Sequence, residues 1–116
     1  MGELSVGTRN QGDITIVDIE GSVDTVTSGK LSGLFDKLLA DKAVKIVVNL
    51  SKAKYINSAG WGIFLGNLKR VKMASGNIVL AQMSEEVRHI YTLLGFKSFL
   101  KQYPTEAEAI ATYSGG

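Results

Sequence analysis

The sequence predicts a single α/β domain built on a mixed, mostly parallel sheet. Short runs rich in β-branched residues alternate with longer segments whose apolar residues recur at helical spacing, which is typical of parallel strands joined by helices. The first two runs follow each other directly, which predicts an antiparallel hairpin. The length of 116 residues and the 45% of hydrophobic residues suit one domain over residues 1–116. We expect its core to span about residues 4–113 and the tail, 114–116, to fray.

The opening hairpin is predicted from alternation and from turn residues. Apolar and polar residues alternate over Leu4–Thr8, and the second strand, Asp13–Glu20, is the more apolar of the two. Asn10–Gly12 between them supplies residues that favour a turn. Because the first strand is less apolar, we expect it to lie at the edge of the sheet.

A helix and a buried strand follow the hairpin. Asp24 or Thr25 is a suitable N-cap, and the helix after it presents one apolar face made of Leu31, Leu34, Phe35, Leu38 and Leu39. Lys45–Leu50 is short and rich in β-branched residues, which predicts a central strand covered on both faces. We expect Ser51–Ile56 to be a loop.

The second half of the chain continues the alternation. Ser58 stands at the start of a second amphipathic helix, which ends at Ser75, and Asn77–Ala81 predicts a third buried strand. Ser84 is suited to cap a third helix, and Gly95 stands at the position that favours a left-handed residue after a helix. A further short strand is expected within residues 96–101, and a capping box at 105–108 opens a last helix that runs through residue 110.

The predicted element order is therefore ββαβαβαβα. The periodicities also predict a buried set, which consists of Ile16, Leu34, Leu38, Ile46, Val48, Phe64, Leu68, Val79, Ile90 and Leu94.

Composition excludes several classes of protein. The chain has no cysteine and only one histidine, so we expect no disulfide, no metal site, no cofactor and no chelator-sensitive folding. The net charge of +2 is small and the basic residues are scattered, which argues against nucleic-acid binding. The apolar runs are too short to cross a membrane, and the N-terminus lacks the features of a signal peptide. These observations predict a cytoplasmic protein that is not bound to a membrane.

The segment Tyr55-Ile-Asn-Ser-Ala-Gly-Trp-Gly62 is the strongest candidate for a functional site. It places the Ser58 hydroxyl and two glycines where a loop enters a helix, and free backbone N–H groups there favour an anion. Ligands or partners of such sheets usually contact the loops at the carboxyl ends of the parallel strands. The two loops that qualify best here are residues 21–25 and 52–60. Two interpretations remain open at this point: Ser58 is an ordinary N-cap, or it accepts a phosphoryl group.

Catalytic interpretations of this segment are weaker. The third glycine of a dinucleotide-binding fingerprint is missing, and no Gly-Lys-Ser/Thr of a phosphate-binding loop is present. Ser58 lacks the Gly-x-Ser-x-Gly elbow of hydrolases, and only His89 could serve as its base. Because the chain offers no base, metal set or cofactor loop, a small enzyme is the least favoured class.

The sequence resembles the STAS domains, specifically the bacterial anti-sigma factor antagonists, also called anti-anti-sigma factors. The likeness covers about Leu4 to Tyr113. Residues 21–24 look like the family's Gly-x-Leu-Asp, residues 46–51 look like its hydrophobic-Asp-Leu-Ser, and residues 55–62 are similar to its aromatic-Ile-Asp-Ser-Ser/Ala-Gly-Leu-Gly. Residues 76–80, 87–95 and 104–109 match its last third. Together and in this order these motifs are fairly specific.

The resemblance implies a sheet with helices packed mainly on one face, and a binding protein without catalysis. It implies that a partner kinase of the histidine-kinase-like ATPase type, which is also the anti-sigma factor, phosphorylates Ser58. A metal-dependent serine phosphatase would remove the phosphate, and the unphosphorylated form would capture the anti-sigma factor and release a sigma factor. The resemblance places the partner-binding surface at Asp24, Thr25, Asn57, Ser58, Ala59, Gly60 and Trp61. We expect a monomer or weak dimer.

Two residues depart from the family pattern. Asn57 replaces the usual Asp and removes a negative charge beside the acceptor, which changes kinase recognition or indicates a different partner. Trp61 replaces the usual Leu, and it enlarges the apolar contact surface or repacks the core. The alternative function is therefore a STAS interaction or scaffold module without a sigma-factor link, for example one associated with a transporter or another signalling partner.

Overall fold

A five-stranded sheet forms the centre of the computed structural model, which describes residues 3–114. The strands are β1 (Leu4–Gln11), β2 (Ile14–Val23), β3 (Lys45–Ile56), β4 (Asn77–Ala81) and β5 (Gln102–Tyr103), and they lie side by side in chain order. β1 pairs antiparallel with β2, and every later pair is parallel. The structure therefore confirms the mixed, mostly parallel sheet and the position of the first strand at an edge.

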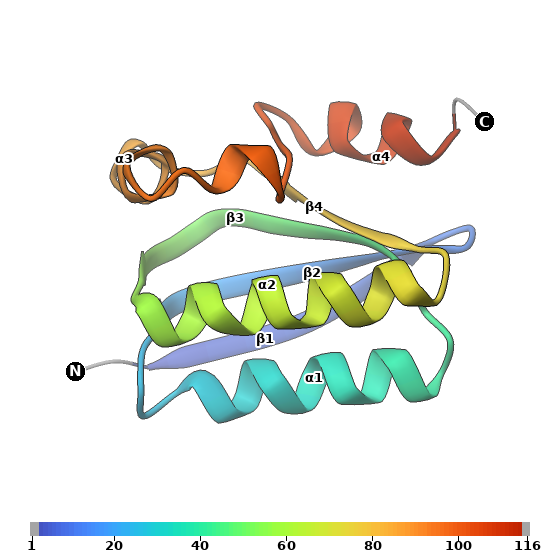
Figure 1. The fold of residues 1–116 in the computed structure, drawn as a ribbon, viewed down its shortest axis with the longest axis horizontal. Helices are drawn as coiled ribbons and strands as arrows, with labels where there is room; N and C mark the ends of the chain where they lie inside the picture. Colours follow the sequence, from blue (N-terminus) through green and yellow to red (C-terminus); the bar gives the residue numbers. More distant parts are fainter. Residues whose placement is uncertain (1–2, 115–116) are drawn as a thin grey trace.

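The helices cover the two faces of the sheet unequally. α1 (Ser28–Ala40) and α2 (Ser58–Met73) lie side by side on one face, while α4 (Glu106–Ser114) lies on the opposite side (Figure 1). α3 (Glu85–Leu93) packs its buried residues into the same core as α1 and α2. The expectation that the helices pack mainly on one face is confirmed.

Successive side chains along β3 point to opposite faces of the sheet, so this one strand contributes to the core on both faces. Ile46 and Val48 belong to the large core beneath α1, α2 and α3, whereas Val47 between them belongs to a smaller core beneath α4. All three side chains are fully buried. This is the pattern expected of a central strand whose successive side chains point to opposite faces.

Three strands are longer than the sequence predicted. β1 continues through Asn10 and Gln11, which were predicted to lie in the turn. β3 continues from Leu50 to Ile56, so the predicted loop over residues 51–56 is wrong, and β2 continues to Val23. The pairing of β2 with β3 is irregular beyond Asp18, with register shifts that are typical of β-bulges. Such shifts interrupt the two-residue alternation from which the strand ends were predicted.

The region after α3 also differs from the prediction. A short 3-10 helix, η1 (Phe96–Ser98), occupies the predicted strand over residues 96–101, and β5 begins only after it. Leu94 is 52% exposed because α3 ends before it and Gly95 turns the chain away in a left-handed conformation. Of the other residues in the predicted buried set, only Leu34 and Ile90 are half-buried. Ser114 ends α4, and the rest of the predicted frayed tail lies outside the described residues.

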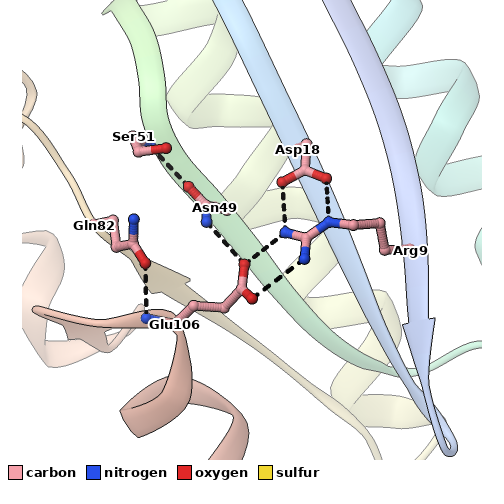
Figure 2. A network of polar contacts seen from close by, with 6 residues as sticks. All are labelled: Arg9, Asp18, Asn49, Ser51, Gln82 and Glu106. Carbon is pink, nitrogen blue, oxygen red and sulfur yellow. Dashed lines mark hydrogen bonds and ion pairs between the residues drawn. The ribbon is translucent and has the colours of Figure 1, made fainter.

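A polar network joins the start of α4 to the sheet. Figure 2 shows the Arg9 guanidinium between the carboxylates of Asp18 and Glu106, with its nearest nitrogen–oxygen distances to both at 2.6 Å. Asn49 on β3 donates to the Glu106 carboxylate, and the Gln82 side chain accepts from the Glu106 backbone N–H. The network ties α4 to three strands, so it positions this helix over the smaller core.

Candidate functional site

The carboxyl ends of β2 and β3 meet at one end of the molecule. Val23 and Ile56 are paired at the ends of these strands, and the Asn57 backbone N–H donates to the Val23 carbonyl at 2.9 Å. The starts of α1 and α2 follow at the left in Figure 1. The two segments that the sequence singled out, residues 21–25 and 52–60, are therefore neighbours.

Gly60 sets how closely α2 approaches these strand ends. A Cβ atom at this position would lie 2.7 Å from a methyl group of Val23 and 2.7 Å from one of Ile56. Both side chains are buried and β-branched, so they have little freedom to move. The absence of a side chain at Gly60 therefore lets the first turn of α2 rest directly on β2 and β3.

Asn57, and not Ser58, caps α2. Asn57 has an extended backbone, and its side-chain oxygen accepts a hydrogen bond from the Gly60 N–H at 3.1 Å. Its carbonyl accepts the first helical hydrogen bond, from the N–H of Trp61. The interpretation of Ser58 as an ordinary N-cap is wrong, because β3 extends so far that the chain leaves the strand only at Asn57, and Asn is among the best N-caps.

Ser58 is consequently the first helical residue and is exposed. Within residues 3–114, its hydroxyl makes no hydrogen bond to another residue, and neither do the backbone N–H groups of Ser58 and Ala59. Unsatisfied N–H groups at a helix start attract negative charge. The arrangement leaves a hydroxyl accessible to a reacting partner, and it tolerates an anion there.

Asp24 shapes the neighbouring turn. Its carboxylate accepts hydrogen bonds from the N–H groups of Val26 and Thr27, both at 2.9 Å. The bond from the Thr27 N–H holds the pKa of Asp24 below its ordinary value, so the group stays ionised at neutral pH. Asp24 therefore caps the turn before α1, while the helix itself begins at Ser28. Thr25, the other suggested cap, is exposed.

Trp61 lies in the core. It is 1% exposed and packs against Phe64, Tyr91 and Phe96 with ring centroids 5.1 to 6.1 Å away. Of the two roles left open for Trp61, the structure supports repacking of the core. Gly60 is also buried, so of the seven predicted residues only the other five contribute to the surface at this end: Asp24, Thr25, Asn57, Ser58 and Ala59.

Two further properties of the described residues bear on the chemistry. Between residues 3 and 114, no three His, Asp or Glu side chains are grouped so that they could hold a metal ion. None of the helices in that range is long and apolar enough to cross a membrane.

The Arg9, Asp18 and Glu106 network was not predicted. The hairpin register pairs Gly7 with Asp18, so Arg9 and Asp18 lie diagonally on one face, and this contact could have been derived from the turn. The ion pair between Arg9 and Glu106 could not have been derived in this way, because it depends on where α4 packs.

The geometry defines a small α/β domain whose strand ends present an exposed serine at a helix start. A family model described as "STAS domain" matches residues 5–109. The chain belongs to the STAS domain family.

Known proteins named as anti-sigma factor antagonists, and one cell fate determinant, resemble the chain over most of its length. The anti-sigma-B factor antagonist of Staphylococcus epidermidis is 25% identical over 97 residues, which cover 84% of this chain and 90% of that protein. An anti-sigma factor antagonist from Mycobacterium paratuberculosis has the same fold, with a TM-score of 0.87, 20% identity, and coverage of 95% and 93% of the two chains. The Bacillus cell fate determinant SpoIIAA, solved in its phosphorylated form, has a TM-score of 0.71 at 18% identity and covers 96% and 99%.

Proposed function

We propose that this protein is an anti-sigma factor antagonist whose binding is switched by phosphorylation of Ser58. In the unphosphorylated form it captures a kinase-like anti-sigma factor in the cytoplasm, and a sigma factor is released. The similarity to proteins named anti-sigma factor antagonists supports the class of partner. The protein itself acts by binding and catalyses no reaction.

One structural observation carries the proposal. Because Asn57 caps α2, the Ser58 hydroxyl has no structural task within the described part of the chain and is exposed at N1 of the helix. Modification of a capping serine would change the group that accepts the capping hydrogen bond and so would disturb the helix start. Ser58 has no such bond to lose, so its modification leaves the fold intact.

The chemical step is an ordinary phosphoryl transfer. The Ser58 oxygen forms a bond to the γ-phosphorus of ATP bound to the partner, the bond between that phosphorus and ADP breaks, and a base of the partner takes the hydroxyl proton. A metal-dependent serine phosphatase would return the hydroxyl by hydrolysis. The product carries about −1.5 to −2 charge beside the unpaired N–H groups of Ser58 and Ala59, where the helix dipole stabilises it.

The switch acts on the interface and spares the fold. Asp24 and Ser58 lie at adjoining ends of β2 and β3, so a phosphate joins a carboxylate that is already ionised. A partner surface that fits the unphosphorylated form must then desolvate nearly two additional charges without a matching cation. A loss of about 3 kcal/mol weakens binding more than a hundredfold.

The test compares variants at Ser58 by titration calorimetry against the cognate anti-sigma factor. Ser58→Ala cannot be charged and is expected to bind at least as tightly as the unphosphorylated protein. Ser58→Asp is expected to bind at least tenfold more weakly and to melt near the wild-type temperature. Ser98→Asp adds the same charge at an exposed serine of η1, away from the strand ends, and is expected to bind like wild type.

Two results would contradict the proposal. If Ser58→Asp binds as tightly as Ser58→Ala, the switch is absent and the alternative of a passive scaffold module replaces it. If mass spectrometry of the protein from its own cells never finds phosphate on Ser58 under conditions in which the anti-sigma factor holds the sigma factor, Ser58 is not the acceptor.

A further inference from the structure

A cavity opens beside the candidate site, between the end of β3 and α3. Its volume is about 530 Å³, which is within the range of small-molecule sites. Its walls include the apolar side chains of Ile56, Trp61, Val87 and Ile90, together with the ring of Tyr55. Nothing in the proposed phosphorylation switch uses this space.

Trp61 supplies a second, independent observation. It lines the cavity, and its indole Nε1 is the one buried side-chain nitrogen or oxygen among residues 3–114 that has no hydrogen-bond partner. A buried donor without an acceptor is costly, and native proteins rarely leave one unsatisfied without a reason. A molecule that enters the cavity with an acceptor oxygen would remove this cost.

The charged side chains around the opening of the cavity determine which ligand charge is favoured. Glu85, Glu86 and His89 on α3 and Lys54 on β3 surround the opening, so carboxylates outnumber the lysine when His89 is neutral. This balance disfavours an anionic ligand such as a carboxylate or phosphate. A cationic group would find the carboxylates, but an ammonium has no acceptor to offer the indole N–H.

We propose that this cavity binds a small, neutral, mostly apolar molecule that carries a hydrogen-bond acceptor such as a ketone oxygen, and that Trp61 Nε1 donates to that oxygen. The indole nitrogen is covered by its neighbours, so the side chains around it must move slightly to let the oxygen reach it. Tyr55, which is 54% exposed, and Ile90, which is half-buried, are the least tightly packed of the apolar side chains that line the cavity. The site is distinct from Ser58 and does not depend on its phosphorylation.

The single tryptophan makes the proposal directly testable by NMR. The whole unphosphorylated protein, labelled with ¹⁵N, is titrated with acetophenone and with ethylbenzene, which has nearly the same shape without the oxygen. We expect acetophenone to bind about three- to tenfold more tightly, as one hydrogen bond allows, and to shift the indole N–H proton downfield. Ethylbenzene should leave that proton nearly unmoved, and benzoate at pH 7 should bind more weakly than acetophenone.

Two variants separate the cavity from the donor. Trp61→Phe keeps an aromatic ring without the N–H and is expected to reduce acetophenone binding to the level of ethylbenzene. Ile90→Phe fills the cavity from its rim and is expected to abolish the binding of both probes. Ile90 is only half-buried, so this variant tests occupancy without disturbing the fully buried core.

The proposal is overturned if neither probe saturates at millimolar concentration in the wild-type protein. The occupant of the cavity would then be a side chain of the protein partner. It is equally overturned if the two probes bind alike with an unmoved indole signal, or if Ile90→Phe binds them as wild type does. Benzoate binding as tightly as acetophenone would refute the assignment of a neutral ligand.

Discussion

Substitution of Gly60 by alanine tests the close contact that positions the candidate site. The new methyl group would lie 2.7 Å from side-chain carbons of both Val23 and Ile56. Neither neighbour can rotate away easily, because both are β-branched and buried at the ends of their strands. The helix start must therefore move away from the sheet, or the strand ends must shift.

The magnitude follows from two opposing effects. Overpacking of a buried contact costs about 1–3 kcal/mol of folding free energy. Replacing glycine by alanine inside a helix gains up to about 1 kcal/mol. Gly60 lies in the first turn, where the gain is smaller, so the net loss should be about 1–2 kcal/mol.

Gly62 provides the matched control on the same helix. A Cβ atom at Gly62 meets no heavy atom within 4 Å, and the residue is exposed. Gly62→Ala should therefore stabilise the protein by about 0.5–1 kcal/mol through helix propensity alone. Urea unfolding of both variants measures the free energies, and the m-value checks that unfolding stays two-state. If Gly60→Ala is as stable as Gly62→Ala, α2 does not rest on the strand ends as described.

Three further predictions concern residues around the same framework. The Tyr113 hydroxyl bonds to the Ile46 backbone at 2.8 Å, so Tyr113→Phe should cost about 1–3 kcal/mol in urea unfolding, and an unchanged midpoint would contradict this. The Arg9 guanidinium holds the pKa of Glu106 below its ordinary value of 4.5, so the stability from this pair is fully present above that value and is lost as the pH falls through the lowered pKa. Glu106→Gln should flatten this pH dependence in thermal melts, and a slope equal to wild type would refute it. Asn57→Ala should cost about 0.5–2 kcal/mol while Asn57→Asp costs almost nothing, and equal midpoints for the two would exclude the cap.

Regular periodicity made most of the fold predictable. The apolar stripe of α2 and the β-branched run at the start of β3 each correspond to one dominant spacing, and both elements appear where that spacing placed them. The end of β3 was missed because Ala53 and Ile56 are its buried residues there, three positions apart, as the irregular pairing with β2 requires. A period of two cannot be recognised across such a shift.

Because the end of β3 was predicted too early, the N-cap of α2 could not be assigned from the sequence. Asn57 and Ser58 are both good N-caps, and the sequence alone offers no means of choosing between neighbours. The choice depends on which residue is the last to pair with β2, and that is a property of the sheet. The sequence correctly placed Ser58 at a helix start, but only the structure shows that Asn57 is the N-cap and that the Ser58 hydroxyl is not needed for capping.

The two departures from the family pattern therefore have different consequences. Trp61 is buried among aromatic rings, so its effect on a partner would be indirect, through the packing of α2 against α3. Asn57 keeps the capping bond that an aspartate would make, so the helix start and the presentation of Ser58 are preserved while one negative charge is lost. Asn57→Asp would restore that charge without changing the cap. A change in partner affinity with this variant, at unchanged stability, would then measure how much of the recognition at this end is electrostatic.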